Sequence, residues 1–173
     1  MEIWDLYDRE GKRTGKTWER SLGDKQIPDG YYHMVVDILV QHEDGTYLLT
    51  QRDLHKDTYP GFWEASAGGA ATAGEEPLEA AERELLEETG LTALSMELVG
   101  HSFRETSHGM YYSYLAKVDA DKDSVVLQEG ETVDYQWVDD RGLIEHVDSD
   151  VAVKTHNDRY KEYFDGIRAK LDA

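Results

Sequence analysis

The chain of 173 residues carries a formal net charge of −19 at pH 7, with 39% hydrophobic residues, 10% aromatic residues and no cysteine. This length and composition predict one folded domain with a hydrophobic core. The absence of cysteine excludes disulfides, thiolate metal sites and a cysteine nucleophile, and the negative charge argues against polymeric nucleic acid and anionic membranes as partners.

The first 30 residues are polar and rich in turn-forming residues. Short strands are predicted near residues 3–7 and 14–19. The charged start of the chain lacks the pattern of a signal peptide, and no apolar run reaches the roughly 20 residues that span a bilayer. We therefore expect a cytoplasmic protein that does not bind a membrane, with residues 1–30 as an N-terminal extension packed on a domain formed by residues 31–173.

Three strands are predicted between the extension and a glycine-rich loop. Residues 31–41 form a run of β-branched and aromatic residues, residues 42–45 predict a turn, and residues 46–52 predict a second strand. This pattern indicates a hairpin. A loop over residues 53–61 leads into a short strand over residues 62–66.

A helix is predicted over residues 77–89. Pro77 suits the first helical position, and Gly90 suits the C-terminal cap. Apolar residues recur at helical spacing and predict one buried stripe. The stripe consists of Leu78, Ala81, Leu85 and Leu86.

The second half of the chain predicts strands near residues 94–104, 110–118 and 132–138. A C-terminal helix is expected over about residues 155–170, with its apolar stripe formed by Tyr160, Phe164 and Ile167. Strands mixed with two or three helices predict an α+β fold, either as such or as a helix–sheet–helix sandwich.

The most informative segment is GAATAGEEPLEAAERELLEETGL, residues 69–91. It fits the pattern G-x5-E-x7-R-E-U-x-E-E-x-G-U, where U is apolar, and in this pattern it resembles the Nudix hydrolases. The resemblance implies a Nudix-like α/β/α sandwich with a mixed central sheet, and metal-assisted cleavage of a diphosphate linked to another moiety. The fixed positions are Gly69, Glu75, Arg83, Glu84, Leu85, Glu87, Glu88, Gly90 and Leu91.

Three carboxylates of this segment, Glu84, Glu87 and Glu88, fall at i, i+3 and i+4 and therefore share one helix face. Like charges at this spacing oppose the helix unless cations relieve them. Hard divalent ions such as Mg²⁺ or Mn²⁺ prefer oxygen ligands and also bind phosphates. The pattern predicts a metal site, whereas three glutamates without the rest of the pattern would indicate only a solvated acidic face.

The resemblance also implies roles for individual residues. The backbone carbonyl of Gly69 is expected to bind a metal, and Arg83 is expected to pair with Glu75 and orient the glutamates. Catalytic roles are expected for Glu84, Arg83 and Glu131. Glu131 and the nearby Glu129 lie in a loop where family members carry an acidic residue, so Glu131 is the candidate general base. The alternatives are a base within the helix, or a solvated Glu131 without a role.

The sequence leaves the substrate open between a nucleoside diphosphate or triphosphate, ADP-ribose and a dinucleoside polyphosphate. Arg52, Lys56 and Arg104 are candidates to bind phosphates, with ordinary surface cations as the alternative for each. Several aromatic residues could stack on a base, although most are expected in the core. These are Tyr59, Phe62, Trp63, Tyr111, Tyr112 and Tyr114.

Residues 2–20 resemble the N-terminal extension of a subgroup related to isopentenyl-diphosphate isomerase. The isomerase needs a cysteine, which this chain lacks, so hydrolysis is favoured. A further alternative is a Nudix domain that senses a ligand without turnover. In the extension Trp4, Tyr7 and Trp18 would suit either a homodimer interface or a cover for the domain's own sheet.

Overall fold

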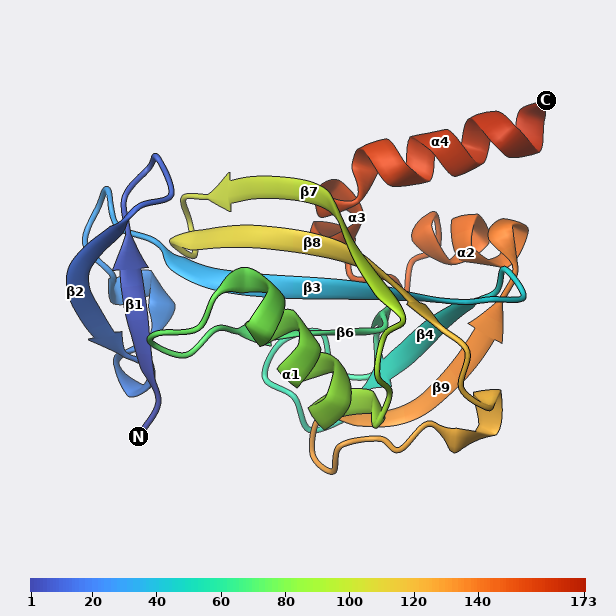
Figure 1. Ribbon diagram of the computed structural model, residues 1–173, viewed down its shortest axis with the longest axis horizontal. Helices are drawn as coiled ribbons and strands as arrows, with labels where there is room; N and C mark the ends of the chain where they lie inside the picture. The colour runs from blue at the N-terminus through green and yellow to red at the C-terminus, as the bar shows by residue number, and fades with distance from the viewer.

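The computed structural model describes residues 1–173 and contains a two-stranded sheet, a seven-stranded sheet and four α-helices (Figure 1). The strands are β1 (Ile3–Tyr7), β2 (Arg13–Glu19), β3 (His33–His42), β4 (Tyr47–Arg52), β5 (Trp63–Ala65), β6 (Ala67–Ala70), β7 (Ser95–Arg104), β8 (Gly109–Val118) and β9 (Thr132–Val138). The helices are α1 (Pro77–Thr89), α2 (Asp140–Val147), α3 (Lys154–Arg159) and α4 (Lys161–Asp172). None of them is long and apolar enough to cross a membrane.

The large sheet is mixed, as predicted. Its main path runs in the order β5-β4-β3-β8-β7, while β6 pairs with β3 and β9 pairs with β4. β3 and β8 run parallel from His33 opposite Gly109 to His42 opposite Val118. The other pairs in this sheet are antiparallel. The α+β class and the mixed central sheet are therefore confirmed.

Two hydrophobic cores lie on opposite faces of the large sheet. Val36 and Ile38 of β3 belong to the core under α1, together with Leu85 of that helix. Leu39, which follows Ile38 on the same strand, belongs to the second core, which contains Leu143 of α2 and residues of α4. Because side chains alternate along a strand, one apolar run supplies both cores. The helices on both faces produce the α/β/α sandwich seen in Figure 1.

The predicted hairpin of β3 and β4 is paired only beside its turn, at Gln41 and Tyr47. Further from the turn the side chain of Ser66 lies between the strands. Its hydroxyl donates to Leu48 O at 2.7 Å and accepts from Val40 N at 2.8 Å. The two strands therefore separate, which allows β3 to pair with β6 and β4 to pair with β5.

Helix α1 begins and ends at the predicted residues, but the prediction of its apolar stripe was only half right. Ala81 and Leu85 are buried, whereas Leu78 and Leu86 are 45% and 53% exposed. The buried face is rotated because it also includes two carboxylates. Its buried residues are Ala80, Ala81, Glu84, Leu85, Glu88 and Thr89.

The C-terminal segment differs from the single predicted helix. It is broken at Tyr160 into α3 and α4, and α2 precedes it as an element that the sequence pattern did not reveal. Tyr160 is fully buried, and its hydroxyl donates to Tyr114 O at 2.9 Å. The predicted stripe is otherwise correct, since Phe164 and Ile167 are also buried.

Candidate active site

The glycine-rich segment reaches α1 through β6 and a loop that ends at the helix start. Gly68 and Gly69 lie in β6, opposite Asp37 and Val36 of β3. At the helix start, Glu79 Oε1 accepts a hydrogen bond of 3.1 Å from Glu76 N, which satisfies an amide that the helix leaves free. The sheet and the helix cap together fix the direction in which α1 presents its glutamates.

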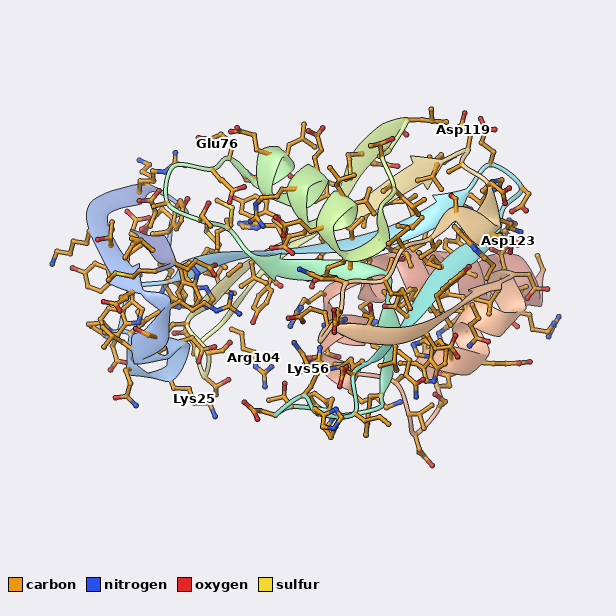
Figure 2. All side chains as sticks on the ribbon, turned by 90° about the horizontal axis from the view of Figure 1, so that it is seen from below. Lys25, Lys56, Glu76, Arg104, Asp119 and Asp123 are labelled. Carbon is orange, nitrogen blue, oxygen red and sulfur yellow. The ribbon has the colours of Figure 1, made fainter.

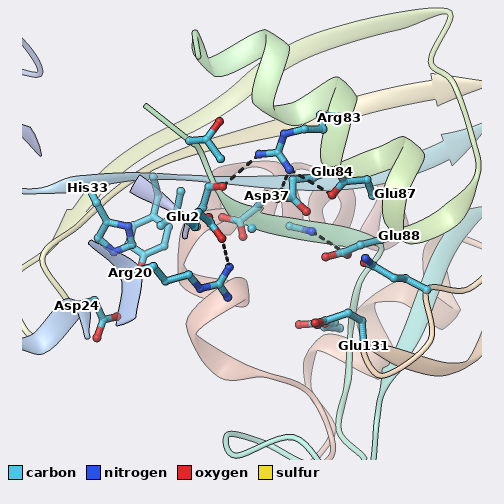
Figure 3. A pocket seen from close by; sticks show the side chains of 18 of the residues that line it. Glu2, Arg20, Asp24, His33, Asp37, Arg83, Glu84, Glu87, Glu88 and Glu131 are labelled. Carbon is cyan, nitrogen blue, oxygen red and sulfur yellow. Dashed lines mark hydrogen bonds and ion pairs between the residues drawn. The ribbon is translucent and has the colours of Figure 1, made fainter. Parts of the chain in front are cut away.

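Arg83 connects this helix to the loop before it. Its Nε and Nη2 each donate to the Glu75 carboxylate at 2.9 Å, so the predicted pairing is present. Its Nη1 donates to Glu84 at 2.9 Å and to Glu87 at 3.2 Å (Figure 3). Burial acts to raise the pKa of Glu75, but hydrogen bonds from Arg83 and Thr72 outweigh it and lower the pKa to about 2. Glu75 therefore stays ionised and holds the guanidinium in place.

The Glu84 carboxyl group packs against the backbone of Gly69. A Cβ atom at Gly69 would lie 2.5 Å from the Glu84 carboxyl carbon, so only glycine leaves room for this contact. The side chain of Glu84 is 11% exposed. Burial raises the pKa of Glu84 to about 7, although Arg83 acts in the opposite direction. This carboxylate is consequently short of positive partners.

Glu88 lies one turn further along the same face and is more deeply buried. Its carboxylate accepts one hydrogen bond, from Gly68 N at 3.2 Å. Burial raises the pKa of Glu88 well above its ordinary value, and the negative charges of Glu84 and Glu64 raise it further. A buried carboxylate beside other carboxylates is unfavourable unless a cation compensates it.

The chemistry of these groups fits a hard divalent cation. Glu84, Glu87 and Glu88 supply carboxylate oxygens, and Gly69, whose Cβ position faces the Glu84 carboxyl group, lines the same cleft. An all-oxygen donor set is the kind that Mg²⁺ or Mn²⁺ prefers. No three acidic or histidine side chains are preassembled as a metal cage, and Arg83 is bonded to two of the carboxylates. A cation at this position therefore has to compete with Arg83.

These carboxylates open into a cleft of about 940 Å³. In Figure 3 Glu88 and Glu131 lie at one end, while Asp24 and His33 lie at the other. Lys56 and Arg52 line the cleft, and both are paired with acids: Lys56 contacts Glu131, and Arg52 Nη1 lies 3.3 Å from Glu64. The cleft thus brings most of the predicted site residues together.

Arg104 is the predicted phosphate-binding residue that lies elsewhere. It lines a smaller cavity of about 290 Å³, which adjoins the main cleft because Tyr111 and Arg159 line both. Figure 2 shows that Lys56 projects from the loop after β4, whereas Arg104 projects from the end of β7. Glu129, the neighbour of the candidate base, does not line the main cleft.

The cleft contains an ion pair that the sequence did not predict. Arg159 Nη1 donates to Asp37 Oδ1 at 2.7 Å, and the guanidinium lies 3.8 Å from the Tyr111 ring centroid. Asp37 is 3% exposed. A single carboxylate inside the apolar run 31–41 was the available signal, because a buried charge requires a partner.

The C-terminal helices also bring His156 to the cleft, close to Glu64. His156 Nδ1 lies 3.5 Å from Glu64 Oε2, and it has no hydrogen-bond partner. The sequence did not mark either residue as part of the site. Glu64 is a single charged residue in a short strand, and His156 precedes the buried stripe of α4.

The aromatic candidates for base stacking are mostly packed in the protein. Tyr111 and Tyr114 are buried, and Tyr112 packs against His101 with ring centroids 4.3 Å apart. Tyr59 is 41% exposed and packs against Phe62 in the loop after β4. Of the six candidates only Tyr111 lines the cleft.

The N-terminal extension forms one end of the cleft through Glu2, Trp4, Arg20 and Asp24. Trp4 stacks on His33 with ring centroids 4.1 Å apart and an interplanar angle of 12°. Trp4 and Tyr7 are each 5% exposed, so they are covered within this chain. For Trp4 and Tyr7, this burial fits a cover for the domain's own sheet better than a homodimer interface.

Comparison with known proteins assigns the family. The NUDIX domain model matches residues 31–152. The chain is 35% identical over 139 residues to an uncharacterised Nudix hydrolase of Listeria innocua, covering 80% of each protein. It is 30% identical over 158 residues to an isopentenyl-diphosphate Delta-isomerase of Corynebacterium diphtheriae, covering 86% of this chain and 85% of the relative.

The fold comparison agrees with this assignment. A crystal structure of a Deinococcus radiodurans protein superposes with a TM-score of 0.68 at 21% identity, covering 97% of this chain and 98% of that one. The matched residues 31–152 include the whole catalytic pattern and the carboxylates described above. The protein is therefore a Nudix hydrolase.

Proposed function

We propose that the protein is a divalent-metal-dependent hydrolase that cleaves a diphosphate bond in a small nucleoside diphosphate derivative or a related diphosphate compound. The observation that supports this proposal most directly is the pair of undercompensated carboxylates, Glu84 and Glu88, at the edge of a cleft of about 940 Å³. Buried carboxylates whose negative charge is not fully compensated favour cation binding, and the cleft is large enough for a small-molecule substrate.

In this proposal Mg²⁺ or Mn²⁺ is held by the carboxylates of Glu84, Glu87 and Glu88 and by the carbonyl of Gly69. When bound, the cation supplies electrophilic stabilisation of the diphosphate and activation of the attacking water. Arg83 orients Glu84 through its two-point contact with Glu75. Because Arg83 also neutralises part of the acidic cluster, it keeps these side chains in place before a cation binds.

The charge of the cleft supports dependence on a cation. The cations Arg20, Arg52, Lys56, Arg83 and Arg159 each contact at least one acid. Phosphates would therefore meet few free positive charges and several carboxylates. A divalent ion reverses the local charge because it becomes the largest charge in its site.

Glu131 is proposed as the general base, and Arg52 and Lys56 are proposed to bind phosphates. Glu131 and Glu88 interact electrostatically within the cleft. Lys56 contacts Glu131 directly, so a phosphate that binds Lys56 would compete for the same ammonium group and free the carboxylate. Arg104 is proposed to act only on a substrate that extends into the smaller cavity.

The similarity to the Corynebacterium isomerase supports a second candidate, isomerisation of an allylic diphosphate. That reaction is disfavoured because the chain has no cysteine and because the cleft walls are mostly charged and polar. A hydrocarbon chain gains little from such walls. A third candidate is a ligand sensor without turnover.

One assay separates the three candidates. A panel of diphosphate compounds, including isopentenyl diphosphate, is incubated with Mg²⁺ or Mn²⁺, and release of phosphate or pyrophosphate is measured beside isomer formation. We expect hydrolysis that disappears with a chelator and falls by orders of magnitude in Glu88→Gln. Glu162→Gln, an exposed change on α4, is the matched control. Thermal stabilisation by one compound without turnover would instead support the sensor.

A further inference from the structure

The N-terminal extension folds as a hairpin beside the loop of residues 71–76, which joins β6 to α1 and is here called the catalytic loop. β1 and β2 pair antiparallel, with Trp4 opposite Trp18 and Asp5 opposite Thr17. Tyr7 joins this hairpin to the domain, because its N–H and C=O each bond to Tyr32 at 2.8 and 2.9 Å. In Figure 1 the hairpin lies at the end of the large sheet, next to the loop that leads from β6 into α1.

Backbone amides of this catalytic loop, residues 71–76, donate to the hairpin. Ala73 N donates to Ile3 O at 2.8 Å, and Gly74 N donates to Asp5 Oδ2 at 2.8 Å. Gly74 has a φ of 89°, a conformation that favours glycine. The loop also has hydrogen bonds of its own between Thr72 and Glu75. Contacts with β1 hold the part around Gly74, which has the uncommon backbone conformation.

Arg13 of β2 adds three contacts through three different nitrogens. Nε donates to Asp5 Oδ2 at 3.1 Å, Nη1 to Glu76 Oε1 at 2.8 Å and Nη2 to Glu75 O at 2.8 Å. Its guanidinium also lies 5.7 Å from the centroid of the Tyr7 ring. The planar fork of arginine can satisfy these acceptors at the same time, whereas a lysine ammonium has no such geometry.

The same loop contacts the catalytic helix on its other side. Glu75 contributes its backbone carbonyl to Arg13 and its carboxylate to Arg83. Arg83 in turn contacts Glu84. A displacement of the loop would therefore move the Glu75 carboxylate, the guanidinium of Arg83 and the carboxylate of Glu84.

We propose that Asp5 and Arg13 are positioning residues for hydrolysis, which hold the catalytic loop so that Glu75 and Arg83 place Glu84 in its working position. This inference rests on the proposed function. Both residues lie outside residues 31–152, the part matched by the NUDIX domain model. The catalytic loop is thus held on one side by Arg83 of α1 and on the other side by Asp5 and Arg13 of the hairpin.

The test compares Arg13→Gln, Arg13→Lys and Asp5→Ala with the control Lys16→Gln. Lys16 also lies on β2 and has its ammonium 5.0 Å from the centroid of a tyrosine ring, that of Tyr31, but it does not contact the loop. We expect Arg13→Gln and Asp5→Ala to lower kcat about tenfold with little change in KM, because small displacements of catalytic groups slow the chemical step.

Arg13→Lys keeps the positive charge but removes the planar, forked guanidinium, so it separates the effects of these two properties. If the three-point contact matters, this variant resembles Arg13→Gln; wild-type kcat in Arg13→Lys would show that only the charge is needed and would overturn the assignment of the fork. Unfolding temperatures should change little in the Arg13 variants, because partly exposed ion pairs contribute little to stability. The Arg13 side chain is 39% exposed.

Two further measurements separate this inference from the proposed function. Hydrogen exchange of the amides of Ala73 and Gly74, and Mg²⁺ or Mn²⁺ affinity by calorimetry, need no substrate. We expect faster exchange and several-fold weaker metal binding in Asp5→Ala and Arg13→Gln. If the wild type hydrolyses nothing, the proposed function fails while these readouts still test the loop. Unchanged exchange, kcat and metal affinity relative to Lys16→Gln would overturn the positioning role.

Discussion

The carboxyl group of Glu84 lies in the space that a side chain at Gly69 would occupy. This contact makes the glycine a steric requirement of the site and not only a turn residue. It places a carboxylate of the helix α1 against a glycine of the strand β6. Substitution at Gly69 therefore tests the position of Glu84 directly.

We expect Gly69→Ala to lower kcat by about tenfold or more, because the added methyl group displaces the Glu84 carboxylate. Steady-state kinetics across a range of Mg²⁺ concentrations checks this prediction, and the metal requirement should rise as well. The control is Gly166→Ala. Gly166 lies inside α4 with open space around its Cβ position, so alanine should raise the unfolding temperature, since it favours helix by about 1 kcal/mol. Unaltered kinetics in Gly69→Ala would contradict the predicted displacement.

Glu88→Gln should stabilise the metal-free protein while it abolishes activity. Glu88 is buried beside other carboxylates, so removing its charge removes an unfavourable interaction of the order of 1 kcal/mol. The glutamine oxygen still accepts the hydrogen bond from Gly68 N. Chemical unfolding in the presence of a chelator measures this gain. Glu87→Gln is the control, because that side chain is 46% exposed and its loss should change stability little; equal stability of wild type and Glu88→Gln would count against the prediction.

His33 should lower stability as the pH drops from 7 to 5, opposing Glu84 and Glu88, whose raised pKa values favour the folded protein in this range. Burial lowers the pKa of His33 to about 4 from its ordinary 6.5. Between pH 6.5 and 4 the His33 side chain is therefore protonated in the unfolded chain and neutral in the folded protein. The contribution of His33 to the free energy of unfolding is complete above pH 6.5 and is lost as the pH falls toward 4. We expect His33→Phe, which keeps a ring against Trp4, to raise the unfolding free energy at pH 5 relative to pH 7 by about 1 to 2 kcal/mol compared with the wild type.

Urea unfolding at the two pH values measures this difference. His55→Gln is the control, because the His55 side chain is 95% exposed, and it should retain the wild-type pH dependence. A wild-type slope in His33→Phe would reject the contribution of His33. His146, whose pKa burial also lowers to about 4, should leave a residual dependence in the variant.

The ion pair of Asp37 and Arg159 should show strong coupling in a double-mutant cycle. Arg159→Gln leaves the buried carboxylate of Asp37 without its cation, which costs about 3–5 kcal/mol for such pairs. Asp37→Asn in the same chain should recover much of this loss. Chemical unfolding of the four proteins measures the coupling, and additive effects would exclude it. Lys161→Gln, which breaks an exposed pair with Asp165, should change stability by less than about 1 kcal/mol.

Helix α1 shows how far the sequence pattern reaches. Pro77 and Gly90 fix its ends, because their backbone restrictions act locally. The buried face was harder to predict, because apolar periodicity favours Leu78 and Leu86, which are exposed. The sheet instead covers Glu84 and Glu88, and the family pattern, not hydrophobicity, indicated that these carboxylates are the residues facing the site.

The cleft shows what the pattern does not reach. Its walls come from the N-terminal extension, from β3 and β6, from α1 and α3, and from the loops that contain Lys56 and Glu131. Asp37 and Arg159 are 122 positions apart in the chain. Their contact depends on how α3 packs over the sheet, and the break at Tyr160 that ends α3 follows from the burial of that ring.

The sequence by itself determined the family, the candidate catalytic glutamates, the limits of α1 and the alternation that gives each strand two faces, because these depend on residue type and on spacing within one element. Only the tertiary structure decided which remote residues line the cleft, why Arg104 lines the smaller cavity and Lys56 the main cleft, and how Asp5 and Arg13 reach the catalytic loop. Those relations depend on long-range packing and on the pairing of charges across elements, which local spacing does not specify.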